Sequence, residues 1–484
     1  MKHIVILFFL GTLMSGQAQT KKWTLKECVA YALSNNISLK QSALDQELAR
    51  IDQSDAIGAY LPSLNSSVSN SWNTGLTQNI TTGVLENQIS RNSSYSVTAS
   101  MNLFQGLRNL RGLQRAKLNT LAAQYGLDKM QDDISLFVAN AFLQVLTNKA
   151  NVAVLQAQNQ VTIDQITRTE DLVDAGVLPQ GDLLEIRAAD ATEKQSLVSA
   201  ENGVKLSLIN LAQLLLIRDY ASFDIEDKGY EIVDTGILDK SVAELLDAAQ
   251  ENRNEVRIAE MNVALAQKDV QIARSSYLPS LGAYLNYNTR ESDRFSGVQT
   301  LLDPETPFLS TTDPIGFVDS SGAAVYGFSP NIIGLQEIPA KPWEEQLYLN
   351  DGVSYGVQMN IPIFNGNATR NNVKRSRINL LNRELMLEQA KMDLESTVYQ
   401  ALVDAKGALK AYEAAQKASS SQELAFNYAQ QRYDVGLINA FDFSQSKTRY
   451  DNSIIDLNRA KYDYIFKLKV LELYFGIPAA ELKF

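Results

Sequence analysis

The sequence predicts an internally duplicated α+β membrane protein whose few strands close into a barrel only when several copies combine. Two repeated features support this fold class. Residues 60–64 read Tyr-Leu-Pro-Ser-Leu, and the same five letters recur 217 residues later at 277–281. Each copy is followed by short segments that alternate with a period of two, and then by a long segment without proline. Several further matches between the halves keep the same order, which indicates two copies of one structural unit.

Residues 1–18 are predicted to be a secretory signal peptide. A basic start leads into an apolar run at 4–13, and small residues follow up to Ala18. The first repeat is then expected at 19–235 and the second at 236–484. The only cysteine, Cys28, is expected to be a buried small residue on the first helix.

Composition excludes several classes of function. The only histidine, His3, lies in the predicted signal, which removes His-dependent catalytic triads and zinc sites with His ligands. We therefore expect no catalytic residue, no metal site and no cofactor. The formal net charge of −11 argues against a nucleic-acid partner, whose phosphates require a basic surface. After the signal, no apolar run approaches the roughly 20 residues of a membrane helix, so any crossing must use strands.

Each repeat is expected to open with a helix, at about 24–58 and at about 241–275. Both helices begin with a capping-box pattern, in which Thr24 or Ser241 is followed three residues later by Glu. The proline of each Tyr-Leu-Pro-Ser-Leu segment then ends the helix, because the residue before proline avoids helical backbone angles.

Strands are predicted at about 63–72 and 93–104, and at about 280–288 and 352–364. In 95–103 the odd positions are apolar and the even positions are Ser, Thr or Asn. Each segment has about ten residues, the length of a tilted membrane strand. The polar face is small and uncharged, which suits a water-filled lumen. A soluble two-sheet domain with one wet face is the alternative.

Four strands cannot close a membrane barrel by themselves. The smallest such barrels have about eight strands, and an open edge in lipid leaves backbone groups unpaired. Three chains would supply a barrel of twelve. The segment at about 289–350 holds six of the 11 prolines and has no helical period, so we expect a long irregular loop on the outer side of the barrel.

Long helices are predicted at 105–217 and at 367–475. Apolar residues near 134–145 recur in steps of four and three, as in a coiled-coil seam. Gly176 and Gly436 interrupt the two segments, and glycine supplies the left-handed angles that end a helix. A helix of about 70 residues spans roughly 100 Å.

In this arrangement the chain resembles the TolC-type outer-membrane efflux channels of Gram-negative bacteria, over its whole mature length. The motifs that carry the resemblance are short, and their order and duplication make them specific. They are Trp-Thr-Leu at 23–25, the two Tyr-Leu-Pro-Ser-Leu segments, the Phe-x-Gly segments at 104–106 and 364–366, and the turns at 174–177 and 433–437.

The resemblance implies a homotrimer with one 12-stranded β-barrel in the outer membrane, in contact with its lipid, continued by a periplasmic α-helical coiled-coil barrel. It also implies a passive exit channel of a tripartite efflux pump, which takes drugs and small molecules from an inner-membrane transporter and binds a periplasmic adaptor protein. The exit duct of a type I protein-secretion system is the alternative within the fold. A secreted coiled-coil structural or adhesive protein and an exported carboxylate hydrolase are the alternatives from other classes.

Residues at the helical turns receive roles from the same resemblance. Gly176, Val177, Gly436 and Leu437 match the tips onto which the adaptor docks.

The resemblance further implies a constricted periplasmic entrance. Asp442 matches an aspartate that forms an anionic ring from three copies; a plain carboxylate at a helix start is the alternative. Gln445 stands where the family has a second aspartate, so the ring carries half the charge. Asp182 and Tyr433 match two members of a polar lock, and the position of its arginine falls on Ile438.

Aromatic residues recur at the helix–strand junctions of both halves. They are expected to form either an inner aromatic girdle at the lipid interface or plugs of the protein core. They are Tyr60, Phe104, Tyr277 and Phe364.

Overall fold

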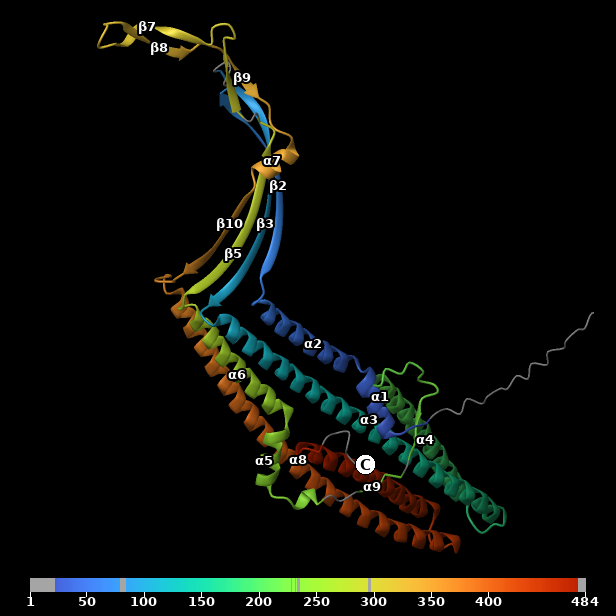
Figure 1. Cartoon of the computed structure of the whole chain (residues 1–484). Coiled ribbons are helices and arrows are strands. Elements are labelled where there is room, and N and C mark those ends of the chain that lie inside the picture. The colour runs from blue at the N-terminus through green and yellow to red at the C-terminus, as the bar shows by residue number, and fades with distance from the viewer. Residues whose placement is uncertain are drawn as a thin grey trace, which may run out of the picture. The chain divides into compact units, whose positions relative to one another are not determined.

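The computed structural model describes residues 22–78, 84–227, 229–230, 232, 236–294 and 297–477 (Figure 1). The predicted signal peptide, residues 1–18, lies outside the described residues. The chain divides into two compact units. The first contains the described parts of Met1–Asp52, Arg115–Gln267 and Ser376–Phe484, and the second those of Gln53–Gln114 and Lys268–Arg375.

The helices of the two repeats match in length, pair by pair, which confirms the internal duplication. Helices α1 (Leu25–Asn35) and α5 (Val242–Asn252) have 11 residues each, and α2 (Ile37–Gly58) and α6 (Asn254–Ser275) have 22 each. Helices α3 (Arg108–Asp174) and α8 (Ala368–Asp434) have 67 each, and α4 (Gln180–Leu214) and α9 (Ala440–Tyr474) have 35 each. Two short strands, β1 (Lys22–Trp23) and β4 (Asp224–Ile225), pair in parallel, and a 3₁₀ turn covers Ile237–Asp239.

Side-chain caps begin the first helix of each repeat, as the sequence predicts. The hydroxyl of Thr24 accepts a hydrogen bond from the backbone N–H of Glu27 at 3.3 Å, and the Glu27 carboxylate accepts one from the N–H of Thr24 at 2.9 Å. In the second repeat, Ser241 accepts from the N–H of Glu244 at 3.3 Å. These bonds satisfy N–H groups that have no partner within the helix.

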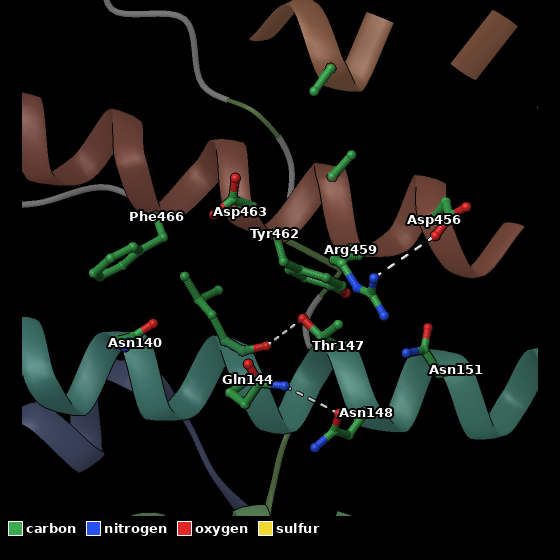
Figure 2. A pocket seen from close by; sticks show the side chains of 13 residues that line it. Asn140, Gln144, Thr147, Asn148, Asn151, Asp456, Arg459, Tyr462, Asp463 and Phe466 are labelled. Carbon is green, nitrogen blue, oxygen red and sulfur yellow. Dashed lines mark hydrogen bonds and ion pairs between the residues drawn. The ribbon is translucent and has the colours of Figure 1, made fainter. Parts of the chain in front are cut away.

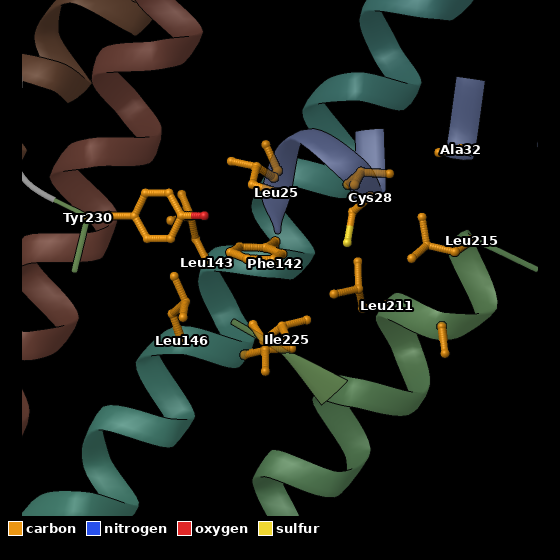
Figure 3. Close-up of a cluster of buried hydrophobic side chains, with 14 of the residues drawn as sticks. Leu25, Cys28, Ala32, Phe142, Leu143, Leu146, Leu211, Leu215, Ile225 and Tyr230 are labelled. Atoms are coloured by element: carbon orange, nitrogen blue, oxygen red, sulfur yellow. The ribbon is translucent and has the colours of Figure 1, made fainter. Parts of the chain in front are cut away.

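The helical unit contains one apolar cluster for each repeat, and equivalent positions occupy equivalent places. Cys28 on α1 is buried against α3 and α4 (Figure 3), which confirms its predicted structural role. In the second repeat, Leu245 takes the same position in the duplication and is buried against α8. Helix α9 joins the repeats, because Ile465 belongs to the first cluster and Leu468 to the second.

The second unit is built on a four-stranded antiparallel sheet in the order β10-β5-β3-β2. Its strands are β2 (Ser63–Gln78), β3 (Leu85–Gln105), β5 (Ser280–Ser292) and β10 (Gly352–Asn360). Strands β2 and β10 are the two edges, and among the described residues each pairs on one side only. The sheet is therefore open, as expected for four strands that need partners.

The register confirms the predicted separation of the sheet into an apolar and a polar face. Leu64 lies opposite Ala99, Ala99 opposite Leu285, and Leu285 opposite Tyr355, so one row of apolar side chains crosses all four strands. On the other face, hydroxyl groups pair between β2 and β3: Ser63 and Ser100 are 2.9 Å apart, and Ser67 and Ser96 are 2.7 Å apart.

The strand bounds differ from those predicted. Strand β2 continues to Gln78 rather than ending at 72, and β3 begins at Leu85 rather than 93. Half of the extra residues are Asn, Thr, Ser or Gly, which are less typical of strands, but ladder hydrogen bonds use the backbone and tolerate them. Strand β10 ends early, at Asn360, because Pro362 cannot donate to a ladder.

The prediction of an irregular loop at about 289–350 is wrong. The chain forms a pair of strands, β6 (Gly297–Leu302) with β9 (Ile332–Ile338), a second pair, β7 (Phe308–Phe317) with β8 (Ala324–Pro330), and helix α7 (Trp343–Leu349). The prolines are compatible with the strands because Pro314 lies at a register shift and Pro330 is the last residue of β8.

The four aromatic residues at the helix–strand junctions, Tyr60, Phe104, Tyr277 and Phe364, are all exposed in the single chain. Exposure argues against plugs of this chain's own core. An aromatic girdle at the lipid interface and plugs where the barrel meets the helical tube, formed with neighbouring copies, both stay predictions.

Two equivalent glycines provide a test of the fold. Gly106 and Gly366 both have left-handed φ angles, of +60° and +63°. A Cβ on Gly106 would lie 2.5 Å from the carbonyl oxygen of Ser275 and 2.8 Å from the Cβ of Leu278, whereas a Cβ on Gly366 would meet nothing within 4 Å. The two copies of the Phe-x-Gly motif therefore differ in packing but share their backbone geometry.

We predict that Gly106→Ala destabilises the protein by about 2–5 kcal/mol, from left-handed strain of about 1–2 kcal/mol and overpacking of about 1–3 kcal/mol. The matched variant Gly366→Ala should lose only the strain, about 1–2 kcal/mol. Thermal unfolding followed by circular dichroism in detergent compares the two. Equal losses would show that the close approach at Gly106 is not a constraint.

Candidate functional site

The two helix-to-helix turns of the first unit have the same backbone geometry. Gly176 and Gly436 both have φ of +75°. In each turn the next residue closes the helix end: the N–H of Val177 donates to the carbonyl of Leu172, and that of Leu437 to the carbonyl of Arg432, both at 2.8 Å. A hydrogen bond from a residue to the carbonyl five positions earlier defines the Schellman motif, which requires a left-handed residue at the glycine position. Val177 and Leu437 are left exposed.

The second turn leads into a capped helix that carries two of the predicted entrance residues. The side-chain oxygen of Asn439 accepts a hydrogen bond from the N–H of Asp442 at 2.8 Å and so fixes the first turn of α9. The Asp442 carboxylate lies in that first turn, where the helix dipole stabilises a negative charge. Asp442 and Gln445 are both exposed and lie three residues apart, on one side of the helix.

Tyr433 is the buried centre of the region next to this turn. Its ring stacks on that of Phe443, with centroids 5.0 Å apart, and its hydroxyl lies 3.0 Å from that of Thr169 on α3. Burial raises the pKa of Tyr433, and the charge of Asp182 adds to the shift. The structure therefore places Tyr433 close enough to Asp182 to feel its charge, and the hydroxyl of Thr169 lies within hydrogen-bond distance of the tyrosine.

Ile438 occupies the position where the resemblance leads us to expect an arginine, and it packs against the apolar cluster that contains Tyr433. A different arginine is engaged nearby. Arg168 on α3 contacts Asp434, the last residue of α8, at 2.6 Å. This ion pair joins the two repeats beside Tyr433. Sequence reasoning did not find it, because 266 residues separate its members.

A buried charge cluster lies further along α9 and ties it to α3 and α4. The ammonium of Lys447 is 2.7 Å from Glu193 on α4 and 3.0 Å from Asp451 on α9. From α3, Thr162 and Asn159 donate to the two oxygens of the Glu193 carboxylate at 2.9 and 3.1 Å. Burying such charges is expensive unless every member is paired, so this cluster holds the three helices in one arrangement.

Asp451 is the carboxylate of this cluster that lies on α9 itself. Burial raises its pKa, and the neighbouring Lys447 ammonium offsets only part of that effect. One of its carboxylate oxygens is buried without a hydrogen-bond partner. The sequence offered one signal for the cluster: Lys447 follows the buried Phe443 by four residues and so lies on the core-facing side of α9.

A polar cleft of about 550 Å³ lies between α3 and α9 (Figure 2). Asp456 and Asp463 line it, but Asp456 pairs with Arg459 and Asp463 with Lys467, at 4.0 and 3.3 Å. Each carboxylate is therefore held by a cation on its own helix, and the two are not arranged as an acid–base pair. Amide side chains of α3 fill the other wall: Asn140, Gln144, Asn148 and Asn151.

In the part of the chain that the structure describes, no three Asp, Glu, Cys or His side chains gather closely enough to hold a metal ion. None of the described helices has the length and apolar character that crossing a membrane requires.

The profile of the outer membrane efflux protein family matches residues 29–215 and 348–476. The chain belongs to this family. The matched segments contain both helical turns and the long helix pairs α3–α4 and α8–α9. The protein is therefore an outer-membrane exit duct with a large periplasmic part, and it is not an enzyme.

Two relatives illustrate how far the sequence has diverged. The chain is 21% identical to outer membrane protein TolC of Escherichia coli (strain K12), in an alignment that covers 94% of this chain and 83% of the relative. It is 23% identical to protein CyaE of Bordetella pertussis (strain Tohama I), over 81% of this chain and 70% of the relative.

Solved structures show the same fold. The Campylobacter jejuni CmeC outer membrane channel aligns with a TM-score of 0.72 at 16% identity, over 93% of this chain and 85% of that one. The open state of the Neisseria gonorrhoeae MtrE outer membrane channel aligns with a TM-score of 0.65 at 17% identity, over 93% and 88%. These likenesses confirm the predicted fold class.

Proposed function

We propose that the protein is the outer-membrane exit channel of a tripartite efflux pump, and that it works as a homotrimer. It conducts drugs and other small molecules passively, and an inner-membrane transporter joined through a periplasmic adaptor protein supplies the energy. The observation that carries this proposal is the four-stranded sheet with one apolar face and two unpaired edges. Such a sheet is stable in lipid only when copies join edge to edge into a closed barrel.

The polar face of the sheet supports a water-filled lumen. Its side chains are mainly Ser, Thr and Asn, and they bond to one another across the strands, as Thr98 does to Asn286 at 3.0 Å. Three chains would contribute twelve strands. Single helices of 67 residues span roughly 100 Å at 1.5 Å per residue, which is long enough to carry a conduit deep into the periplasm.

The second helical turn supplies the proposed entrance. Asp442 is exposed at the start of α9, and three symmetric copies would place three carboxylates around one axis. Gln445, one turn further, adds no charge. Asp182 and Tyr433 lie beside this entrance and, with Arg168 and Asp434, form the proposed lock between the repeats.

The function is tested with purified protein in planar bilayers and by deletion of its gene in the native host. We predict a trimer by native mass, discrete current steps, and drug sensitivity of the deletion strain that the intact gene reverses. A soluble monomer without current would contradict the channel. Unchanged drug sensitivity together with loss of a protein from the culture medium would instead support the secretion duct. In the same recordings, Asp442→Ala should change the conductance or the cation block of the channel, and unchanged current traces would remove the proposed ring.

The proposed lock predicts a charge-swap result. An exposed ion pair contributes about 0.2–1 kcal/mol, so three copies of Arg168–Asp434 favour the closed entrance by up to about 3 kcal/mol. Arg168→Asp should therefore raise the open fraction, by up to roughly 100-fold, and adding Asp434→Arg should restore it. Lys410→Asp, which breaks an ion pair within α8, serves as the control. A double variant as open as the single one would exclude a direct pair.

Docking at the tips predicts a loss of function without a loss of the channel. Val177 and Leu437 are apolar and exposed, one at each turn, as expected of a surface that a partner covers. Leu437→Asp should abolish drug resistance in cells while leaving the current steps of the purified trimer unchanged. The matched control is Leu424→Asp, at an exposed position on α8 away from the turn. Normal resistance in Leu437→Asp would argue against docking there.

A further inference from the structure

The upper end of the sheet is the end farther from α2 and α8. There, helix α7 lies beside the last residues of β5, in the place that a neighbouring strand would occupy. Pairing between β10 and β5 stops at Gly352 and Asn288, although β5 continues to Ser292. Beyond that point the side-chain amide of Gln346 binds the backbone of Ser292 twice: its oxygen accepts from the Ser292 N–H and its nitrogen donates to the Ser292 carbonyl, both at 2.9 Å. One amide side chain thus makes both hydrogen bonds that a neighbouring strand would make.

Two further contacts fix the helix in this place. The side-chain nitrogen of Asn350 donates to the carbonyl of Arg290 at 2.9 Å, and the hydroxyl of Thr289 donates to the carbonyl of Leu347 at 2.8 Å. Thr289 and Glu291 follow Leu285 at even spacing, so they lie on the apolar face of the sheet, and both are buried. Helix α7 therefore covers the upper end of β5 on that same face.

Strand β2, at the opposite edge of the sheet, is too long to be paired along its whole length by β10 of another copy. Strand β2 has 16 residues, whereas β10 has 9, so β10 of another copy leaves at least seven residues of β2 without a strand partner. Helix α2 ends at Gly58, shortly before β2, and α8 begins at Ala368, shortly after β10, so both edges start from the helix-bearing end of the sheet. The excess of β2 therefore lies at the other end, where α7 replaces β10.

Exposed apolar side chains lie on both sides of this gap. On the upper part of β2, Trp72 is 64% exposed and Leu76 is 69% exposed, and both share the apolar face with Leu64. On α7, Tyr348 is 81% exposed and Leu349 is 58% exposed. Residues 72–76 of β2 carry no charge, so the exposed glutamates of α7 meet no like charge there.

From this geometry we infer that α7 of one copy packs against the upper part of β2 of the next copy and completes the barrel wall where β10 is too short. The occupant of the exposed face of α7 is thus a second copy of this chain, through Trp72 and Leu76. This assignment rests on the proposed trimeric channel. It adds an interface made of a helix and a strand edge to the strand–strand pairing that closes the barrel.

Cysteine cross-linking tests the interface. In a background with Cys28→Ala, Tyr348→Cys is combined with Trp72→Cys, Thr74→Cys or Leu76→Cys, three positions on one face of β2 that allow for the unknown register. Oxidation of the detergent-purified trimer should give covalent dimers and trimers on a non-reducing gel for at least one pair. Tyr348→Cys alone and Tyr348→Cys with Leu44→Cys, on α2, should remain monomeric.

The outcomes separate this inference from the proposed function. A native mass of one chain would contradict the trimer itself. A trimer without any cross-link would overturn the interface and leave the channel intact. Membrane lipid is the competing occupant, and a variant with Trp343 as its single tryptophan would detect it through quenching by brominated lipid. Strong quenching together with absent cross-links would assign the α7 face to lipid.

A second variant does not depend on cysteine geometry. Tyr348→Ser with Leu349→Ser removes the apolar contact while keeping Gln346 and Asn350, which hold the helix on β5. The trimer should then dissociate in detergent at a temperature at which the wild-type trimer persists. Glu344→Gln, an exposed change on the same helix, should leave the dissociation temperature unchanged. Equal behaviour of the two variants would contradict the interface.

Discussion

The unpaired backbone at the two edges of the sheet is the constraint on which the other features depend. Strands β2 and β10 each present N–H and C=O groups that have no partner in the described chain, and such groups cost several kcal/mol each in hydrocarbon. The apolar face makes the sheet suitable for lipid, but the edges make a single copy unsuitable. Assembly is therefore a condition for the membrane fold, and subunit contacts are part of that fold.

Duplication determines how the helical unit forms its apolar core. Each repeat places equivalent positions in its own apolar cluster, as Cys28 and Leu245 show. Helix α9 then joins the two, with Ile465 in one cluster and Leu468 in the other. The buried Lys447 adds specificity to this join, because its pair with Glu193 forms only when α4 and α9 meet in one register.

Structural features that follow a periodic sequence pattern were predictable from the sequence. Features that depend on contacts between residues far apart in the sequence were not. Alternation in 95–103 predicted both faces of the sheet, since side chains in a strand point to opposite sides in turn. The upper parts of β2 and β3 were missed because their Asn, Thr and Ser residues carry no alternation. For α7, Pro342 followed by two glutamates in the first turn was an available signal of a helix start. No local pattern could have joined Arg168 to Asp434.

The entrance region combines rigid and weak contacts in a way that suits a duct opened by a partner. The Schellman turns at Gly176 and Gly436 and the Asn439 cap fix the backbone, so the tips keep their shape. The contacts between the repeats at this point differ in strength. Tyr433 lies within hydrogen-bond distance of Thr169 and belongs to an apolar cluster that also contains Ile186 of α4. The ion pair between Arg168 and Asp434 is partly exposed, and such pairs are individually weak. In the proposed channel, a partner that binds the exposed tips must supply enough differential affinity to break the contacts that opening separates, because an equilibrium shifts by no more than the differential affinity of the ligand. The ion pair accounts for at most about 1 kcal/mol of this cost in each chain. Ile438 packs in the same apolar cluster, so the charged contact between the repeats beside Tyr433 is supplied by Arg168 and Asp434 instead.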